Sequence, residues 1–212
     1  MLRPESVIDL SMRLNEETPV YPGDPSVQVD VTSSFEEAGF LNTRLTLGAH
    51  NGTHIDAEAH MIRGGRTLNE YPLSRFHGRG VLLDVRGGAG ALDLSEVVVD
   101  SRSVVLLWTG LSDARYEPDY YAKIPDLTME LVEHLIAADV KMVGIDAGSI
   151  DGEPYEIHKA LLSHGILIAE NLVGLSTLVS RAFTVWALPL NVEVEACPAR
   201  VLARVDQTEP AS

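Results

Sequence analysis

The segment Gly48–His60, GAHNGTHIDAEAH, contains four side chains that can bind a divalent cation: His50, His54, Asp56 and His60. Neutral imidazoles and carboxylates are the ligands that Zn²⁺ and Mn²⁺ sites use. Three protein ligands that leave coordination positions open are typical of a catalytic site rather than a structural one. The segment therefore predicts a catalytic site for zinc or manganese.

The spacing of these residues indicates which backbone can bring their side chains together. On a helix, positions 50 and 54 would share a face, but position 56 would lie about 240° from position 50 at 100° per residue. On an extended backbone, residues 54 and 56 point to the same side, and the glycines at 48 and 52 permit a bend that returns His50 toward them. We therefore expect loop or strand here. The alternative is a chance grouping of ordinary surface or core histidines.

A second pair of ligand-type residues, His158 and Glu170, flanks a predicted short helix and strand near residues 156–169. Either residue could add a ligand, and the Asp56 carboxylate could then bridge two ions ~3.5–4 Å apart. Alternatively, His158 is an exposed helix residue and Glu170 is a charge at a strand end. These patterns leave open whether the site holds one ion or two.

A divalent ion held by such ligands could activate a water molecule. It lowers the pKa of bound water from 15.7 to about 7 and polarises a carbonyl group. His60 follows Asp56 closely and can reach the same pocket, and the ordinary imidazole pKa near 6.5 suits a group that exchanges protons. Tyr21, in the turn YPGDP, is predicted to line an aromatic pocket for the substrate, with a plain surface turn as the alternative.

Apolar runs of strand length occur along the whole chain, which indicates one mixed α/β domain over residues 1–212 with more strand than helix. The clearest helix is Thr128–Asp139, with a cap at Asp126 or Thr128, and a shorter helix is predicted near Glu156. Continuously apolar strands must be covered on both faces, whereas the alternation around Leu45 predicts a strand with one face in water. The predicted strands are Ser6–Leu10, Val27–Val31, Leu41–Leu47, Gly80–Val85, Ser103–Trp108, Lys141–Ile145, Ile166–Ala169, Phe183–Pro189 and Ala199–Val205.

The composition argues against several classes of protein. With 45% hydrophobic and 22% charged residues, the 212-residue chain resembles an ordinary globular protein. Its 31 acidic and 16 basic residues give a net charge of −15, which disfavours binding to nucleic acid and to anionic membranes. One cysteine excludes an internal disulfide, and no apolar run is long enough for a signal peptide or a membrane span. We therefore expect a cytoplasmic protein that acts on a small molecule.

The stretch His50–His60 resembles the signature His-x-Gly-Thr-His-x-Asp-x-Pro-x-His of the metal-dependent cyclase family, which includes bacterial kynurenine formamidases and isatin hydrolases. It reads HNGTHIDAEAH. The resemblance extends over nearly the whole chain through YPGDP (21–25), VLLDV (81–85), VLLWTG (105–110), GIDAGSID (144–151), HKALLSHGILIAEN (158–171) and ALPL (187–190).

This resemblance implies a fold, an assembly and a role for each site residue. The implied fold is a swivelling β/β/α domain, assembled into homodimers or homotetramers. The implied roles are a first metal held by His50, His54 and Asp56, a second ion, where present, held by Asp56, His158 and Glu170, and acid/base catalysis by His60.

Departures from the family pattern bear on the substrate. Glu58 stands where the family usually has proline and could perturb nearby pKa values or point to solvent. Gly148 stands where proline is frequent, and the stretch from Gly148 to His158 is shorter than expected for a formamidase. The sequence therefore predicts hydrolysis of the C–N bond of a small amide, formamide or lactam, with N-formylkynurenine as one candidate. The alternatives are a metal-dependent cyclisation or dehydration, and a catalytically silent metal-binding or assembly protein.

Overall fold

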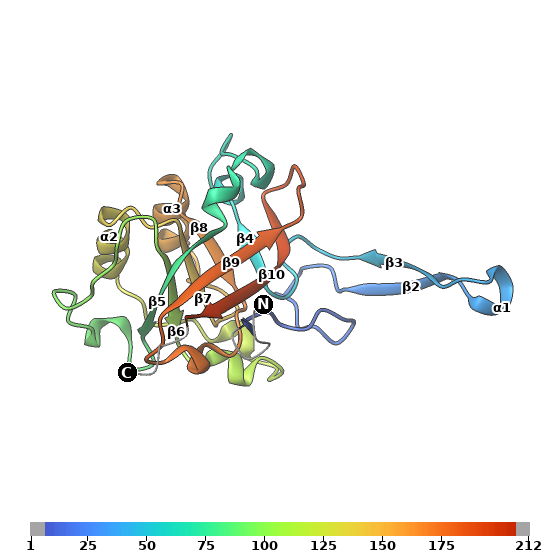
Figure 1. The fold of residues 1–212 in the computed structure, drawn as a ribbon, viewed down its shortest axis with the longest axis horizontal. Helices are drawn as coiled ribbons and strands as arrows, with labels where there is room; N and C mark the ends of the chain where they lie inside the picture. Colours follow the sequence, from blue (N-terminus) through green and yellow to red (C-terminus); the bar gives the residue numbers. More distant parts are fainter. Residues whose placement is uncertain (1–6, 207–212) are drawn as a thin grey trace, which may run out of the picture.

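The computed structural model describes residues 7–206, in which seven strands close into a mixed barrel (Figure 1). Around the barrel the strands follow the order β10, β4, β8, β7, β6, β5 and β9, and β9 pairs with β10 to complete the ring. The pairs β5–β6, β6–β7 and β7–β8 are parallel, and the other pairs are antiparallel. The barrel strands are β4 His54–Asp56, β5 His77–Asp84, β6 Val104–Trp108, β7 Met142–Ile145, β8 Leu167–Glu170, β9 Phe183–Pro189 and β10 Ala196–Val205, while β1 Val7–Asp9 pairs with the end of β10.

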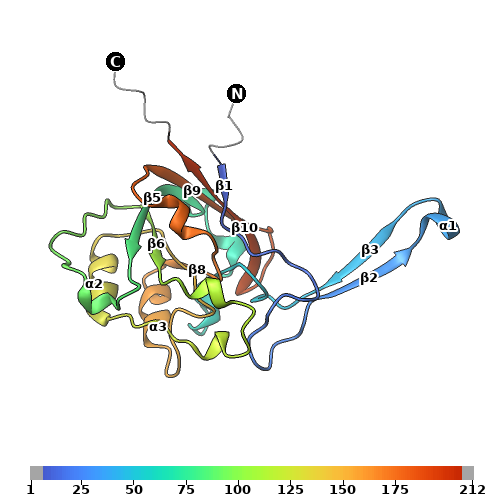
Figure 2. The same cartoon turned by 90° about the horizontal axis from the view of Figure 1, so that it is seen from below.

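Two helices cover the outer face of the parallel strands (Figure 2). Helix α2 spans Met129–Ala137, and the Thr128 hydroxyl caps it by accepting a hydrogen bond from the backbone N–H of Leu131. Helix α3 spans Glu156–Ser163. Because side chains alternate along a strand, Val105 of β6 packs under these helices, whereas Val104 points into the barrel interior. The barrel therefore has one core inside it and a second core between its outer face and the helices.

Strands β2 (Gln28–Ser33) and β3 (Asn42–Thr46) form a separate two-stranded hairpin that projects from the barrel, with the short helix α1 (Phe35–Ala38) at its tip (Figures 1 and 2). The expected alternation is present, because Val29 lies opposite Leu45 and Asp30 lies opposite Arg44 on the other face. The prediction that one face of this strand would be covered is wrong for the described chain, because every residue of β3 is exposed. We call this hairpin, residues 28–46, the arm.

The remaining sequence predictions agree with the structure to within a few residues. Each predicted strand is present, although the predicted strand Ser6–Leu10 begins at a residue outside the described range. Both predicted helices are present, and Thr128 rather than Asp126 provides the cap of α2. The mixed α/β architecture with more strand than helix is confirmed. The swivelling β/β/α assignment stays a prediction.

No helix within residues 7–206 is both long and apolar enough to cross a membrane.

Candidate metal centre

Strand β4 places His54 and Asp56 on the same face. Ile55 between them belongs to the core inside the barrel, so its two neighbours point to the outer side. Gly52 precedes them at a φ of 62°, and its carbonyl oxygen lies 2.8 Å from Nδ1 of His54. Because that contact requires a proton on Nδ1, the lone pair of Nε2 is free and directed at the site.

The neighbouring strand and the covering helix supply the next two ligand-type residues. Glu170 of β8 lies directly opposite His54 in the antiparallel pair, and its Oε2 is 3.5 Å from His54 Nε2. His158 is buried on α3, and its Nε2 is 3.2 Å from Oε1 of Glu170 and 4.0 Å from Oδ2 of Asp56. The alternative of an exposed His158 is therefore wrong. Glu170 also accepts a hydrogen bond of 2.7 Å from the backbone N–H of Ile150.

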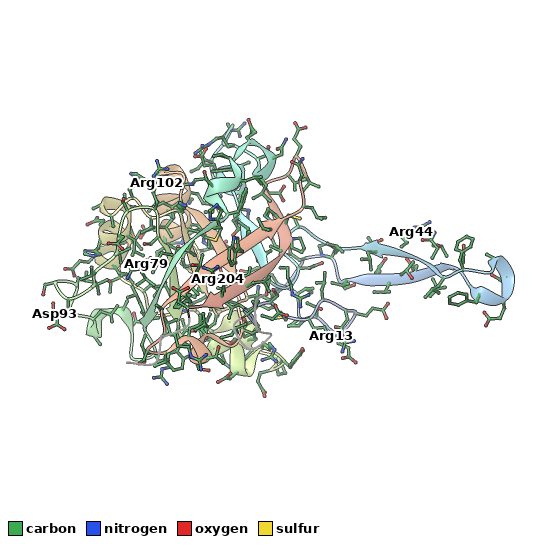
Figure 3. The ribbon with its side chains drawn as sticks, viewed as in Figure 1. Arg13, Arg44, Arg79, Asp93, Arg102 and Arg204 are labelled. Atoms are coloured by element: carbon green, nitrogen blue, oxygen red, sulfur yellow. The ribbon has the colours of Figure 1, made fainter. Side chains whose placement is uncertain are left out.

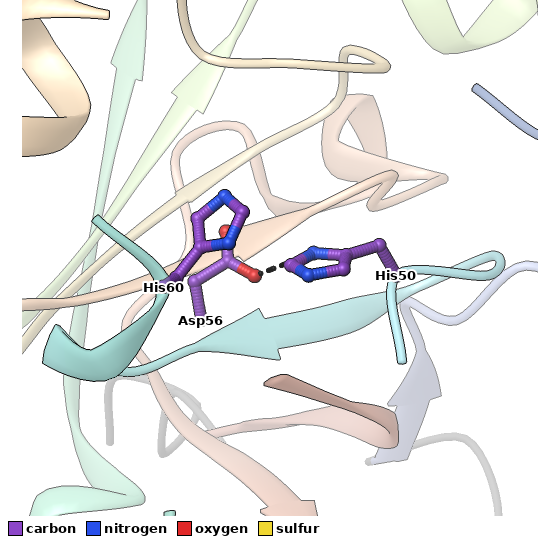
Figure 4. Close-up of side chains that lie close together, drawn as sticks. All are labelled: His50, Asp56 and His60. Atoms are coloured by element: carbon purple, nitrogen blue, oxygen red, sulfur yellow. Dashed lines mark ion pairs between the residues drawn. The ribbon is translucent and has the colours of Figure 1, made fainter. Parts of the chain in front are cut away.

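His50 returns to β4 from the end of the arm, as the spacing predicted. Its Nδ1 is 3.0 Å from Oδ1 of Asp56, and the ring centroids of His50 and His54 are 5.0 Å apart. On the other side of the ring, Nε2 of His50 is 3.6 Å from the carboxylate of Glu195. Figure 4 shows the contact between His50 and Asp56, with the ring of His60 beside them. The three side chains at positions 50, 54 and 56 thus converge, and the Asp56 carboxylate lies among them.

The donor atoms of this cluster fit a cation. Within residues 7–206, His54 Nε2 and both carboxylate oxygens of Asp56 are buried and have no partner with hydrogen-bond geometry, although Nδ1 of His50 lies 3.0 Å from Oδ1 of Asp56. Buried polar atoms are nearly always paired, so three orphaned atoms directed into one space need a further partner. Two sets of ligand atoms lie within 4.8 Å of one another, one from His50, Asp56 and His60, the other from His54, Asp56 and Glu170. Imidazole nitrogens and carboxylate oxygens of this kind suit zinc or manganese.

The electrostatics of the cluster favour a positive charge. Burial opposes ionisation of Asp56, but the neighbouring His54 and His50 outweigh it and hold the pKa of this carboxyl well below its ordinary value. Burial also lowers the pKa of His158, but Asp151 and Glu170 outweigh it and raise that pKa to about 10. A metal ion must displace such protons because it binds neutral imidazoles. Metal affinity should therefore rise with pH.

His60 lies in the short 3₁₀ helix η2 (Glu58–His60) beyond β4. Its ring centroid is 4.4 Å from that of His50 and 5.8 Å from that of His158. Burial lowers the pKa of His60, so the ring is neutral near neutral pH and able to accept a proton. It is half-buried at the edge of the cluster, where a substrate could reach it.

A cavity of about 320 Å³ opens onto the cluster, with His54 and Glu170 buried at its floor. Tyr21, which is 38% exposed, lines this cavity, so the aromatic-pocket interpretation agrees with its position. Its ring meets that of Tyr121 edge to face at 5.6 Å, and Tyr155 lines the cavity near His158. The volume lies at the lower end of the usual range for small-molecule sites.

Two acidic residues outside the predicted ligand set make well-defined contacts in the structure. Asp151 accepts a hydrogen bond from the backbone N–H of Ile157 at 2.6 Å and pairs with Nδ1 of His158, which orients Nε2 of that ring toward Glu170. The motif GIDAGSID contained Asp151, but nothing in the spacing connected it to His158. Asp146 of the same motif caps a turn instead, because its carboxylate accepts hydrogen bonds from Thr109 and from the N–H of Gly110.

Glu58, which replaces the usual proline, takes the first of the two expected courses, because its hydrogen bond raises the pKa of the neighbouring Arg66. Its carboxylate forms an ion pair with Arg66, with a second contact of 3.1 Å to Nε of the same side chain. The guanidinium of Arg66 in turn lies over the ring of Tyr71, 4.3 Å from its centroid. Hydrogen bonding to Arg66 lowers the pKa of Glu58. The contacts of Glu58 therefore stabilise the segment that carries His60. Glu58 is not among the described residues that line the cavity.

A family model described as "Putative cyclase" matches residues 8–152, a span that contains His50, His54, Asp56 and His60. The chain belongs to this family. Kynurenine formamidase of Erythrobacter litoralis is 30% identical over 191 residues, which cover 87% of this chain and 86% of the relative. Kynurenine formamidase of Bacillus cytotoxicus is 30% identical over 205 residues, 93% of this chain and 96% of the relative. An uncharacterised protein of Methanocaldococcus jannaschii is 32% identical over 185 residues, 86% and 91% of the two chains.

Solved structures of cyclase-family proteins share the fold. Isatin hydrolase A from Labrenzia aggregata, bound to benzyl benzoate, superposes with a TM-score of 0.80 at 24% identity, over 93% of this chain and 92% of that one. A potential metal-dependent hydrolase with cyclase activity superposes with a TM-score of 0.76 at 30% identity, over 96% and 98% of the chains. These two solved structures therefore share the fold of this chain.

Proposed function

We propose that this protein is a metal-dependent amidohydrolase that cleaves the C–N bond of a small amide, formamide or lactam. The observation that carries the proposal is the convergence of the orphaned atoms of His54 and Asp56 at the floor of a cavity that His60 also lines. The kynurenine formamidases among its relatives, about 30% identical over most of the chain, support an amide or formamide as substrate. N-formylkynurenine-like and isatin-like molecules are the first compounds to test.

The assignment of ligands rests on the family resemblance and is supported by the convergence of these side chains. We assign His50, His54 and Asp56 to a first zinc or manganese ion, and Asp56, His158 and Glu170 to a second where one is bound. Such an ion, when bound, polarises a carbonyl oxygen and lowers the pKa of water. The burial of Asp56 and the contacts of His54 with Gly52 and of His158 with Asp151 keep the donor atoms oriented before any ligand arrives.

His60 and Tyr21 would act on the substrate. As a neutral ring at the cavity, His60 would accept the proton of the attacking water on a ring nitrogen and deliver it to the leaving nitrogen. Tyr21 would hold the substrate's ring or acyl chain against the aromatic side of the cavity, where an edge-to-face contact is favourable. The half-buried position of His60 leaves its ring within reach of a substrate.

A cyclisation or dehydration is the second candidate, because a structure 30% identical to this chain is described as having cyclase activity. Both reactions need a polarised carbonyl and a mobile proton. Only hydrolysis consumes water and releases an amine, so the products of a compound panel separate the two.

The test is an assay of the purified protein, loaded with Zn²⁺ or Mn²⁺, on N-formyl anilines, lactams and lactones. We expect release of formate or ring-opened acid from at least one formyl or lactam compound. A closed-ring or dehydrated product instead would establish the second candidate. Full metal occupancy without turnover of any compound would indicate a catalytically silent metal-binding or assembly protein.

We also propose that the protein is a homodimer or homotetramer assembled through the arm. An isolated two-stranded hairpin is marginally stable in water, yet the apolar face of the arm carries Val31 and Leu45 at 62% and 61% exposure. At the base of the arm a recess lined by Leu14, Leu47 and Leu190 continues this apolar surface. Each copy thus offers both an arm and a recess, and a two-fold pair would bury the arm of each copy against the other.

A further inference from the structure

Strand β5 has one unpaired edge over its second half. On one side β5 pairs with β6 from Gly80 to Asp84, whereas on the other side it pairs with β9 only as far as Gly80. Strand β9 begins at Phe183, and the preceding segment 178–182 contains no strand. Within the described chain, no strand therefore lies beside residues 81–84 on the β9 side. We call residues 81–84 the free edge of β5.

The backbone groups of the free edge lack partners. The N–H of Ala187 in β9 donates to the carbonyl oxygen of Phe76, which directly precedes β5. Because every second residue of a strand directs its backbone groups to the same side, Leu82 and Asp84 direct theirs to the β9 side. No other segment of the described chain forms a backbone hydrogen bond with these groups. Unpaired N–H and C=O groups at an edge are a template for a further strand.

A groove of about 600 Å³ lies against the free edge, and its volume is within the usual range for binding sites. Leu82 and Trp108 line one side of it, and Leu178 and Phe183 line the other. Val179, also in the lining, is 47% exposed. None of the described lining residues is shared with the cavity at the metal cluster. The groove can therefore accept apolar side chains from a segment that pairs with β5.

Arginine side chains surround this groove. Arg79 and Arg86 precede and follow the free edge along the chain, and Arg181 belongs to the segment on the opposite side. Asp84 is the one acidic residue among the described lining residues, and it pairs with Arg86 at 2.7 Å. The groove thus carries a net positive charge on a chain whose net charge is −15. Such a surface attracts carboxylates, which arginine binds through two parallel hydrogen bonds.

Two of these arginines are available to an incoming carboxylate. Arg181 is exposed and takes part in no ion pair of the described chain. Arg79 pairs with Asp100, but the two side chains are 72% and 58% exposed, and an ion pair in that setting contributes little stability. Arg79 can therefore exchange this partner for another carboxylate. Arg86 stays over the ring of Trp108, 3.7 Å from its centroid, and adds positive charge.

We propose that the free edge of β5 is a docking site for an extended acidic segment of a partner protein. The segment adds to the sheet as a strand, so that its backbone pairs with Leu82 and Asp84. Its apolar side chains enter the groove, and its carboxylates meet Arg79 and Arg181. Strand addition of this kind combines backbone hydrogen bonds with pockets for alternate side chains. The matching sequence alternates apolar and acidic residues over about five positions, the length that lies beside the free edge.

The first test uses the fluorescein-labelled peptide Glu-Val-Glu-Val-Glu, blocked at both ends, and measures its binding to the full chain by fluorescence polarisation. We expect its Kd to be at least about tenfold lower than that of Lys-Val-Lys-Val-Lys. Arg181→Gln should raise the Kd of the acidic peptide about tenfold. The control Arg44→Gln removes the same charge from the arm, which projects away from the body that carries Arg79 (Figure 3), and should keep the wild-type Kd.

Two further measurements test the backbone pairing. The acidic peptide methylated at every backbone nitrogen keeps its charge but cannot donate main-chain hydrogen bonds, so we expect it to bind at least about tenfold more weakly. Amide hydrogen exchange followed by NMR should be fast at Leu82 and Asp84 in the free protein. Addition of the acidic peptide should slow it at least about tenfold at both positions.

Several results would overturn the inference. They are no binding of the acidic peptide, equal affinity for the acidic and basic peptides, a Kd that Arg181→Gln leaves unchanged, and undiminished binding of the methylated peptide. Exchange that is already slow at Leu82 and Asp84 in the free protein would also contradict it, because the chain itself would then cover the edge.

Discussion

His54 and His60 occupy different environments although they lie in one short segment. His54 is buried, with one ring nitrogen held by Gly52 and the other directed at Asp56. His60 is half-buried, and its closest ring contacts are with His50 and His158. The first arrangement suits a metal ligand, and the second suits a proton carrier.

Substitution of each histidine should therefore have a different result. We expect His60→Ala to keep its metal and to lose roughly 10²–10⁴ in kcat, the usual contribution of general acid–base catalysis. We expect His54→Ala to lose the metal itself. Elemental analysis of both purified variants, together with steady-state kinetics, checks the pair. Metal loss from His60→Ala would make His60 a ligand and contradict the assignment.

Gly148 determines how closely Tyr121 approaches the cavity. A Cβ atom at this position would lie 2.5 Å from the ring of Tyr121, closer than any real contact. We expect Gly148→Ala to displace that ring and to raise KM roughly fivefold to thirtyfold, with a smaller effect on kcat. In the control Gly152→Ala, the new Cβ would meet only Ile124 at 3.5 Å, so KM should stay near that of the wild type. Equal KM values for the two variants would show that Tyr121 does not shape the binding site.

The side chains that we propose as metal ligands could be grouped from the sequence because they are concentrated in a local pattern. His50, His54 and Asp56 lie close together along the chain, and their spacing alone excluded a helix. Glu195 was missed because its contact with His50 joins segments that are remote in sequence.

At the level of elements, helix α3 carries His158, whose protonation couples the candidate metal site to the stability of the protein. Without metal, the pKa of His158 is raised from 6.5 to about 10, against the effect of burial, by Asp151 and Glu170. A histidine with a raised folded-state pKa stabilises the protein fully below its unfolded pKa, and this contribution is lost as pH rises through the folded pKa. The metal-free protein should therefore lose this part of its stability between about pH 6.5 and pH 10.

Asp151→Asn tests this link. We expect the fall in the unfolding free energy of the metal-free protein from pH 7 to pH 10 to be smaller in the variant, as measured by urea denaturation. We also expect metal affinity to weaken roughly 10–100-fold, because Asp151 orients the His158 ring. An unchanged metal Kd and an unchanged pH dependence would mean that Asp151 only caps the start of α3.

The order of the elements was largely predictable, because buried parallel strands are continuously apolar and α2 keeps helical spacing. Closure of the strands into a barrel was not, since the pairing of β9 with β10 leaves no signature in either strand alone. Strand β4 has only three residues, and its extended backbone was predicted from its ligands rather than from an apolar run. The alternation in β3 indicated which face is apolar, but not that the chain itself leaves this face uncovered.

At the scale of the whole molecule, the arm carries a group of exposed apolar side chains, which are Val29, Val31, Phe35, Phe40, Leu41 and Leu45. Figure 3 shows Arg79, Arg102 and Arg204 distributed over the body and Arg44 on the arm. Arg44 lies on the polar face, opposite Asp30, whereas Leu45 and Val29 share the other face. A second copy that covers the apolar face would leave these charges in water.

The proposed assembly is tested by Leu45→Glu. We expect the wild type, a chain of 23.0 kDa, to have the mass of two or four chains in size-exclusion chromatography with light scattering. Leu45→Glu should shift it toward the monomer, because it places a charge in the buried contact. Thr46→Glu, on the polar face of the same strand, is the control and should keep the wild-type mass. A monomeric wild type at micromolar concentration would contradict the role of the arm.

The central claim is that His50, His54 and Asp56 bind one cation that keeps a position open to the cavity. The most direct measurement is a crystal structure of the metal-loaded protein with anomalous diffraction recorded at the zinc or manganese edge. The account predicts an anomalous peak ~2.0–2.2 Å from His54 Nε2, a ring nitrogen of His50 and an oxygen of Asp56, with at least one coordination position facing the cavity. A peak elsewhere, or an ion fully enclosed by protein ligands, would contradict it.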